Sequence, residues 1–135
     1  MMRIDGGCHC GEVRYQADVD PQAVSICHCS DCQRLTGTAY RVSVRAARDD
    51  VTITRGEPKR YTKAGDNGKP RHQLFCPSCG SPMFTTGEGE DALEWGIRWG
   101  SIDQRAELSP RSQKWCRSAA SFVYGIEALP GTAKD

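Results

Sequence analysis

Cysteine is the residue type that offers chemistry in this chain, and seven of its eight cysteines fall into three short motifs. In chain order these are Cys8 and Cys10 in "GGCHCG", Cys27, Cys29 and Cys32 in "ICHCSDC", and Cys76 and Cys79 in "FCPSCG". Cysteines at such short spacings supply thiolate ligands to zinc, which takes four ligands in a tetrahedron at structural sites. The motifs therefore predict metal binding.

The first and third motifs are predicted to form one closed site. Cys76 and Cys79 lie in a C-x-x-C turn with a proline and a glycine, and Cys8 and Cys10 are flanked by glycines. Strand pairing can bring two such pairs together although they are far apart in the sequence, and four sulfurs complete a tetrahedron. Zinc bound this way ties the N-terminal strand to the middle of the chain. The alternative for either pair alone is a set of buried free thiols.

The second motif leaves one ligand position open. Cys27, Cys29 and Cys32 are close enough in sequence to share one ion, and the chain offers Cys116 and His28 as candidates for a fourth ligand. Cys116 stands alone in "QKWCRS", and a lone cysteine more often behaves as a small buried hydrophobe. His28 lies between two cysteines of an extended segment, so it is expected to point away from them and outward.

A zinc ion with three protein ligands keeps a vacant position, which is the mark of a catalytic site. Three thiolates give such a site a net negative charge. This charge weakens the attraction of the metal for oxygen and favours sulfur in the vacancy. Zinc also lowers the pKa of a bound thiol and so holds it as the thiolate. The triplet therefore predicts chemistry on a thiol.

Alternation of apolar and polar residues predicts a mainly antiparallel β fold with little helix. The alternation is clear in "EVRYQADV", "YRVSVRA" and "LEWGIRWGSI". Shorter strands are predicted at "VTIT", "HQLFC", "PMFTT" and, near the end, "SAASFVYGIE". A short helix is expected at Ser30–Leu35, with Ser30 or Asp31 as its N-cap and Gly37 just past its end. A further turn of helix is expected at residues 103–109.

A polar segment from residue 55 to 73 is predicted to be a long loop that holds a short strand around Tyr61. Its lysines and arginines, together with Arg34 beside the triplet, are candidates for binding anionic groups of a substrate. Solvated surface charge is the alternative. Asp31 and His28 are the side chains nearest the triplet that are able to carry a proton, although Asp31 is also a candidate helix cap.

Length and charge restrict the class of protein. The 135 residues predict a single zinc-binding domain over 1–135, with a core of about 6–125 and a tail at 126–135. A balance of 18 basic and 17 acidic residues argues against a nucleic-acid partner. The sequence contains no apolar run long enough to span a membrane, so no membrane span is predicted. The opening "MMRIDGGCHC" lacks the apolar stretch of a signal peptide, so the expected location is the cytoplasm. Thiols stay reduced there, which favours metal sites over a disulfide-stapled secreted domain.

Three segments, in this order, resemble one family. "GGCHCGEVRY", "CHCSDCQRLTG" and "FCPSCGSPMF" are similar to the glutathione-dependent formaldehyde-activating enzymes, a family that includes centromere protein V domains. The resemblance runs roughly from Gly6 to Val123. It implies a β-tent fold, with antiparallel sheets around a structural zinc.

The resemblance also implies two Zn²⁺ ions. The structural zinc is expected on Cys8, Cys10, Cys76 and Cys79, and a catalytic zinc on Cys27, Cys29 and Cys32. The implied activity is that of a carbon–sulfur lyase that forms or cleaves S-hydroxymethylglutathione, with glutathione or a similar small thiol as partner. The alternative is a zinc-stabilised binding or carrier module without catalysis. Homodimerisation through a sheet edge is a further expectation.

Overall fold

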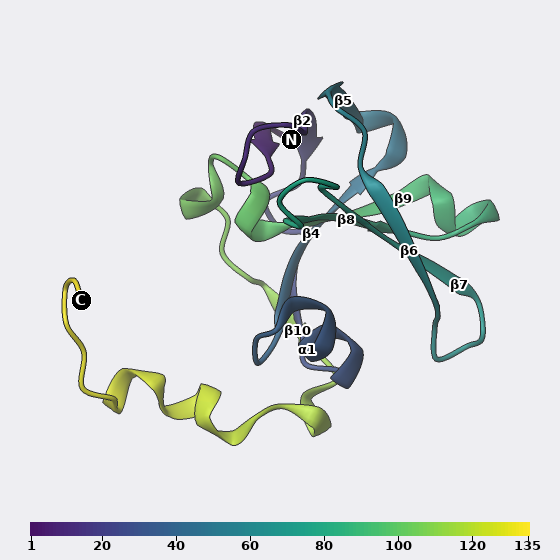
Figure 1. The fold of residues 1–135 in the computed structure, drawn as a ribbon. Helices are drawn as coiled ribbons and strands as arrows, with labels where there is room; N and C mark the ends of the chain where they lie inside the picture. Colours follow the sequence, from purple (N-terminus) through teal and green to yellow (C-terminus); the bar gives the residue numbers. More distant parts are fainter.

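Ten β-strands form two sheets in the computed structural model, which describes residues 1–135 (Figure 1). The smaller sheet has the order β1-β2-β5, and the larger has the order β10-β3-β4-β9-β8-β7-β6. Every pairing is antiparallel except that of β10 with β3. In chain order the strands are β1 (Met2–Gly7), β2 (Arg14–Val19), β3 (Val24–Cys27), β4 (Arg41–Ala47), β5 (Val51–Arg55), β6 (Lys59–Ala64), β7 (Pro70–Phe75), β8 (Pro82–Thr86), β9 (Glu94–Arg98) and β10 (Ser112–Lys114). The predicted mainly β fold is confirmed.

The helical content is small, as predicted. One α-helix, α1 (Ser30–Thr36), follows β3. Six short 3₁₀ helices lie mostly in the connections: η1 (Arg48–Asp50), η2 (Gly89–Leu93), η3 (Trp99–Ser101), η4 (Arg105–Glu107), η5 (Cys116–Ser118) and η6 (Ser121–Ala128). The expected helical turn at residues 103–109 is η4.

The core is built from the apolar positions that alternate along the strands of both sheets. Seventeen buried residues form one cluster, to which β2 contributes Tyr15 and β4 contributes Val44. Phe84 of β8 lies at its centre, because its ring is 4.9 Å from the ring of Tyr15 and 4.9 Å from that of Trp95. Period-two alternation therefore turns one face of the larger sheet toward the core.

The opposite face of the larger sheet is polar. Directly paired residues on neighbouring strands share a face, and Cys27 pairs with Arg41 while Ser43 pairs with Arg98. The helix α1 lies on this side, because Asp31 of α1 forms an ion pair with Lys63 of β6. Sequence alternation thus separates an apolar packing face from a polar face that carries chemistry.

The start of α1 differs from the prediction. The N-cap is Cys29, whose sulfur accepts a hydrogen bond from the backbone N–H of Cys32 at 3.3 Å, and neither Ser30 nor Asp31 caps the helix. The helix ends where expected, at Gly37, whose φ of 67° is the left-handed conformation that glycine adopts without strain.

Two predicted segments are wrong in the larger sheet and at the C-terminus. The strand expected around Tyr61 is present as β6, but residues 55–73 do not form a long loop, because β6 and β7 pair over six residues and leave only a tight turn between them. The segment "SAASFVYGIE" is not a strand but the 3₁₀ helix η6 with its flanking residues. β10 is the edge strand of the larger sheet beside β3, and the residues of η6 pair with no strand although the outer edge of β10 is free.

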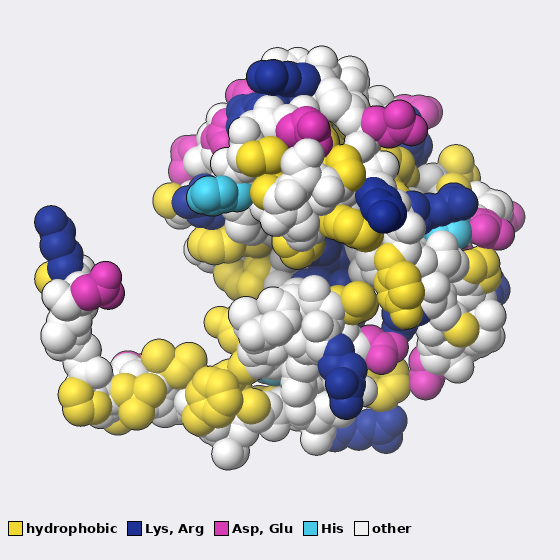
Figure 2. All heavy atoms as spheres, viewed as in Figure 1, with side chains coloured by type: hydrophobic (Ala, Val, Ile, Leu, Met, Phe, Trp, Pro, Cys, Tyr) yellow, Lys and Arg dark blue, Asp and Glu magenta, His cyan; other side chains and the backbone are white.

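The C-terminal segment leaves the body of the molecule (Figure 1). Its apolar side chains Phe122, Tyr124, Ile126 and Leu129 are exposed. Figure 2 shows hydrophobic side chains gathered along this arm. None of the helices has the length and apolar character that crossing a bilayer requires.

Candidate metal centres

The first and third cysteine motifs meet in space. Cys8 and Cys10 follow β1, Cys76 and Cys79 lie between β7 and β8, and all four sulfurs lie within 4.8 Å of one another. Two of the distances are 3.6 Å, from Cys8 to Cys10, and 3.7 Å, from Cys10 to Cys76. A tetrahedral zinc with Zn–S bonds of about 2.3 Å places its sulfurs about 3.8 Å apart. The cluster therefore has the geometry to hold a metal ion.

Backbone N–H groups already point at these sulfurs. Val13 donates to the sulfur of Cys8 at 3.3 Å, and Ser78 and Cys79 donate to the sulfur of Cys76 at 3.4 and 3.5 Å. Such donors stabilise thiolate charge, which a set of four thiolates needs. The turn that carries Cys79 closes at Gly80, whose φ is 76°. The ligand role of the four cysteines stays a prediction.

The second motif also gathers its sulfurs within 4.8 Å of one another. Cys27 ends β3, Cys29 caps α1 and Cys32 lies in the first turn of α1, so the junction of strand and helix sets the triplet. Cys32 is buried, and the other two are half-buried. A hydrogen bond from the Cys32 thiol lowers the pKa of Cys27 to about 5, and the same contact raises the pKa of Cys32. Without a metal, the thiol of Cys32 thus stabilises a thiolate on Cys27, and a metal ion would have to displace the proton of Cys32 to gain all three sulfurs.

Neither candidate for a fourth ligand joins the triplet. Cys116 is exposed, so the expectation of a buried small hydrophobe is wrong for it. His28 does not face outward as predicted, because β10 pairs with β3 and covers it. The residue is 2% exposed, and its Nε2 donates to the side-chain Oε1 of Gln113 at 2.9 Å. The chain thus supplies three sulfurs to this site.

Two cavities, with volumes of about 830 Å³ and about 330 Å³, lie near the triplet, although none of its cysteines lines either of them. Thr36, Pro82, Arg41 and Arg98 border both of them. Thr36 is on the helix that carries Cys32, and Arg41 is the partner of Cys27 in the register of β3 and β4. The cavities and the sulfurs are therefore neighbours in one region of the polar face.

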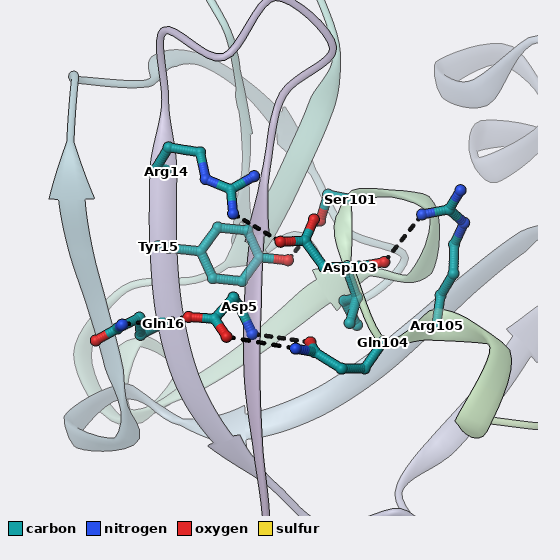
Figure 3. Close-up of polar contacts among 9 residues, drawn as sticks. Asp5, Arg14, Tyr15, Gln16, Ser101, Asp103, Gln104 and Arg105 are labelled. Carbon is teal, nitrogen blue, oxygen red and sulfur yellow. Dashed lines mark hydrogen bonds and ion pairs between the residues drawn. The ribbon is translucent and has the colours of Figure 1, made fainter.

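A polar network forms one wall of the larger cavity (Figure 3). Arg14 and Asp103 point at each other and form an ion pair at 2.6 Å. The hydroxyl of Tyr15 meets that of Ser101 at 2.7 Å. The side chain of Gln104 accepts from the backbone of Asp5 at 2.9 Å. These bonds fasten the loop after β9 to the smaller sheet and fix the shape of the cavity.

Three of the predicted anion-binding residues have acidic partners of their own. Lys63 pairs with Asp31, Lys69 lies 3.9 Å from a carboxylate oxygen of Asp91, and His72 lies 3.1 Å from one of Glu88. Arg34 is exposed and borders neither cavity. The expectation of an anion-binding loop is therefore unsupported for these side chains.

Sequence reasoning missed the two arginines that border both cavities, Arg41 and Arg98. The signal that reveals Arg41 is its place in "YRVSVRA", where it alternates with the buried valines and so faces the polar side. Arg98 has no such signal, because only the register of β4 and β9 places it opposite Ser43.

Comparison with known proteins agrees with these observations. A model of the family "Glutathione-dependent formaldehyde-activating enzyme" matches residues 3–118. A curated protein of Halomonas elongata that bears the name of this family is 28% identical over 87 residues, which are 62% of this chain and 55% of that protein. The chain thus spans about half the length of this curated relative.

The fold has a counterpart among solved structures. A crystal structure of a Rhodobacter sphaeroides protein aligns with a TM-score of 0.64 and 21% identity, over 82% of this chain and 99% of that one. At this identity the likeness shows a shared fold alone. The family match covers most of the residues and includes all three cysteine motifs. On that match, the chain belongs to the glutathione-dependent formaldehyde-activating enzyme family.

Proposed function

We propose that this protein is a zinc-dependent carbon–sulfur lyase that acts on a thiol adduct of the glutathione–formaldehyde type. In this proposal it forms or cleaves S-hydroxymethylglutathione. The observation that carries the proposal is the triplet of Cys27, Cys29 and Cys32, which receives no fourth ligand from the chain. Its Cys27 is paired in the sheet with Arg41, which borders both cavities. A site that only stabilised the fold would be closed by a fourth side chain.

Two zinc ions fit the donor sets. Cys8, Cys10, Cys76 and Cys79 would hold the structural ion, and the triplet would hold the second. Bound at the triplet, zinc would supply the binding of the substrate sulfur as a thiolate. The sulfur donors favour zinc over hard cations, which prefer oxygen.

In this proposal, the side chains around the cavities position the reactants. The reaction joins a thiol sulfur to the carbonyl carbon of formaldehyde, and the proton of the thiol ends on the oxygen that becomes the hydroxyl. The cavity walls hold the two reactants together, which is a large part of such a rate gain. Asp31 and His28 border neither cavity, because Asp31 pairs with Lys63 and His28 is buried behind β3. Their positions argue against either as a direct proton carrier.

The competing function is a zinc-stabilised binding or carrier module. The variant Cys32→Ser separates the two functions, with Cys76→Ser as its matched control in the other cluster. We expect two zinc ions per wild-type chain and one in Cys32→Ser, which keeps its circular dichroism spectrum. NMR follows the rate at which glutathione and its hydroxymethyl adduct interconvert. We expect this rate to fall to the uncatalysed value when Cys32→Ser replaces the wild-type protein.

Each outcome decides between the candidates. Wild-type protein that leaves the exchange rate unchanged contradicts the lyase and favours the carrier. Retained acceleration in Cys32→Ser removes the triplet from the reaction. Loss of both ions with unfolding in Cys32→Ser assigns a structural role to the triplet. Cys76→Ser is expected to lose its own ion and much of its thermal stability.

A further inference from the structure

Two arginines stand on the polar face of the larger sheet without an acidic partner. Six ion pairs occur in the structure, and none of them includes Arg41 or Arg98. Arg41 donates through Nη1 to the side-chain oxygen of Gln73 at 2.9 Å, and Arg98 donates to the hydroxyl of Ser43. Both acceptors are neutral, so the positive charges are not compensated by a carboxylate of the chain.

Strand register places these arginines next to the cysteine triplet. Arg41 on β4 is directly opposite Cys27 on β3, and Ser43, two residues further along β4, is directly opposite Arg98 on β9. Residues two apart on a strand share a face. Cys27, Arg41 and Arg98 therefore lie on one side of three adjacent strands, and both arginines border both cavities.

The burial of Arg98 makes its lack of a partner costly. The residue is 7% exposed, and the pKa of its guanidinium is lowered well below the usual value because burial removes water and because Arg41 adds a like charge nearby. A buried charge is stable only when an opposite charge and hydrogen bonds compensate it. A guanidinium also has five N–H donors, more than one serine can satisfy.

The triplet accounts for only part of this positive charge. Three thiolates around a divalent ion carry one net negative charge, which balances one of the two arginines. Arg71 of β7 adds to the positive field at Arg98, whereas Lys63 is neutralised by Asp31. At least one positive charge at the cavity wall therefore remains for an anionic group that comes from outside the chain.

We propose that Arg41 and Arg98 bind a carboxylate of the thiol substrate and so select thiols that carry a carboxylate close to the sulfur. Gln73 and Ser43 hold the two guanidinium groups in position. Guanidinium groups bind carboxylates through charge-assisted, often bidentate, hydrogen bonds. This proposal deepens the proposed function, because the triplet would receive the sulfur while the arginines receive the carboxylate.

The test uses two probes of the same size that differ only in charge, 3-mercaptopropionate and 3-mercaptopropanamide. Each is titrated into cobalt-loaded protein, in which the thiolate-to-cobalt absorption reports binding of the sulfur while calorimetry gives the affinity. We expect the acid to bind at least about tenfold more tightly than the amide in wild-type protein, which corresponds to about 1.4 kcal/mol.

The variants Arg41→Met and Arg98→Met are expected to reduce this preference to about twofold or less, while the amide binds as it does to wild type. Arg45→Met is the matched control, because Arg45 lies on the same strand, pairs with Glu94 and borders neither cavity. Equal affinity for acid and amide in wild type overturns the proposal. An unchanged preference in both folded variants overturns it as well, because the arginines would then only balance the thiolates.

Failure of the proposed function gives a different result. If neither probe changes the cobalt spectrum, the triplet does not receive the thiol. The carboxylate site is then tested by comparing the affinity of the protein for propionate with its affinity for propanamide, both measured by calorimetry. A preference for propionate that disappears in Arg41→Met and Arg98→Met retains the site, and no preference overturns it.

The stability of Arg98→Met gives a second readout. Replacing a buried charge by an apolar side chain of similar length often leaves stability unchanged or higher. We therefore expect metal-loaded Arg98→Met to melt no lower than wild type although it binds the acid more weakly. A drop of more than about 5 °C would assign Arg98 a structural role instead.

Discussion

At the scale of single residues, one tyrosine connects the core to the wall of the larger cavity. The ring of Tyr15 packs edge-on against Phe84, and its hydroxyl meets that of Ser101 at 2.7 Å. Ser101 in turn donates to the backbone carbonyl of Arg98 at 2.8 Å. Burial raises the pKa of Tyr15, so its hydroxyl remains protonated and available as a donor. Gly6 leaves room for this ring, because a Cβ there would lie 2.3 Å from its hydroxyl.

The variant Tyr15→Phe tests this connection. Losing one buried hydrogen bond while keeping the ring is expected to lower the free energy of unfolding by about 1–2 kcal/mol, measured by urea denaturation of the metal-loaded protein. Tyr61→Phe is the control, because Tyr61 is 55% exposed, and it is expected to change nothing measurable. Equal stability of Tyr15→Phe and wild type would show that the Ser101 contact contributes little.

The residues that gather into one site could be predicted from the sequence where they are close together along the chain. The seven cysteines of the three motifs were separated into two groups by spacing alone, and the structure brings each group together. Arg98 could not be predicted, because its neighbours come from strands that are adjacent only in the folded sheet. The burial of His28 was missed for the same reason, since it depends on β10, some 85 residues away along the chain.

At the scale of elements, α1 is held at both ends. The sulfur of Cys29 caps its first turn, and Gly37 terminates it. Between them, Asp31 pairs with Lys63 and so fastens the helix to the hairpin of β6 and β7. The hydrogen bond from Lys63 lowers the pKa of Asp31. The ion pair is therefore one of the contacts that keep Cys32 over the polar face of the sheet.

This ion pair predicts a pH dependence. Because the pKa of Asp31 is lowered in the folded protein, its contribution to stability is present above the ordinary aspartate pKa of about 3.9 and is lost as the pH falls through the lowered value. Asp31 is half exposed, so the coupling is expected to be below about 1 kcal/mol.

A double-mutant cycle with Asp31→Asn and Lys63→Met measures the coupling by urea denaturation at neutral pH and at several acidic values. The cycle cancels the loss of metal at low pH, because all four proteins share it. Coupling that stays constant down to about pH 2 would contradict the assignment.

Strands in which apolar and polar residues alternate strictly were predicted in the right places. The errors lie in segments whose structure depends on pairing with a distant strand. The hairpin of β6 and β7 was taken for a loop because its lysines and arginines hide the alternation, which only the partner strand makes evident. The last apolar segment was taken for a strand because its composition favours one. In the structure it forms the 3₁₀ helix η6 and does not extend the sheet beyond the edge strand β10.

At the scale of the whole molecule, the four-cysteine cluster links the two sheets. Cys8 and Cys10 follow β1 of the smaller sheet, whereas Cys76 and Cys79 connect β7 and β8 of the larger one. The two sheets also share the apolar core, whose buried residues run from Ile4 to Leu108. We propose on this basis that residues 1–135 fold as one domain, with residues 126–135 as an exposed tail.

Metal removal is expected to proceed in two steps. A chelator such as a pyridylazo dye should take the ion of the triplet quickly and with little change in circular dichroism, because only three side chains of the protein would hold it. The ion of the four-cysteine cluster should leave slowly and together with unfolding, because its binding energy, about 10 kcal/mol in small zinc peptides, is part of the folding energy. Release of both ions in one phase, with or without unfolding, would contradict this division.

The parallel pairing of β10 with β3 has a consequence for the order in which the site is completed. The backbone carbonyl of Lys114 accepts a hydrogen bond from the backbone N–H of His28, and the side chain of Gln113 binds the ring of His28. The backbone carbonyl of Ser118 accepts a hydrogen bond from the side-chain amide of Gln33 of α1. A ribosome releases the amino end of a polypeptide first, so the triplet emerges long before the residues that support it from behind. Cys27, Cys29 and Cys32 are therefore synthesised well before residues 113–118, which support them from behind, and we expect the sulfurs of Cys8, Cys10, Cys76 and Cys79 to come together before the support of the triplet is complete.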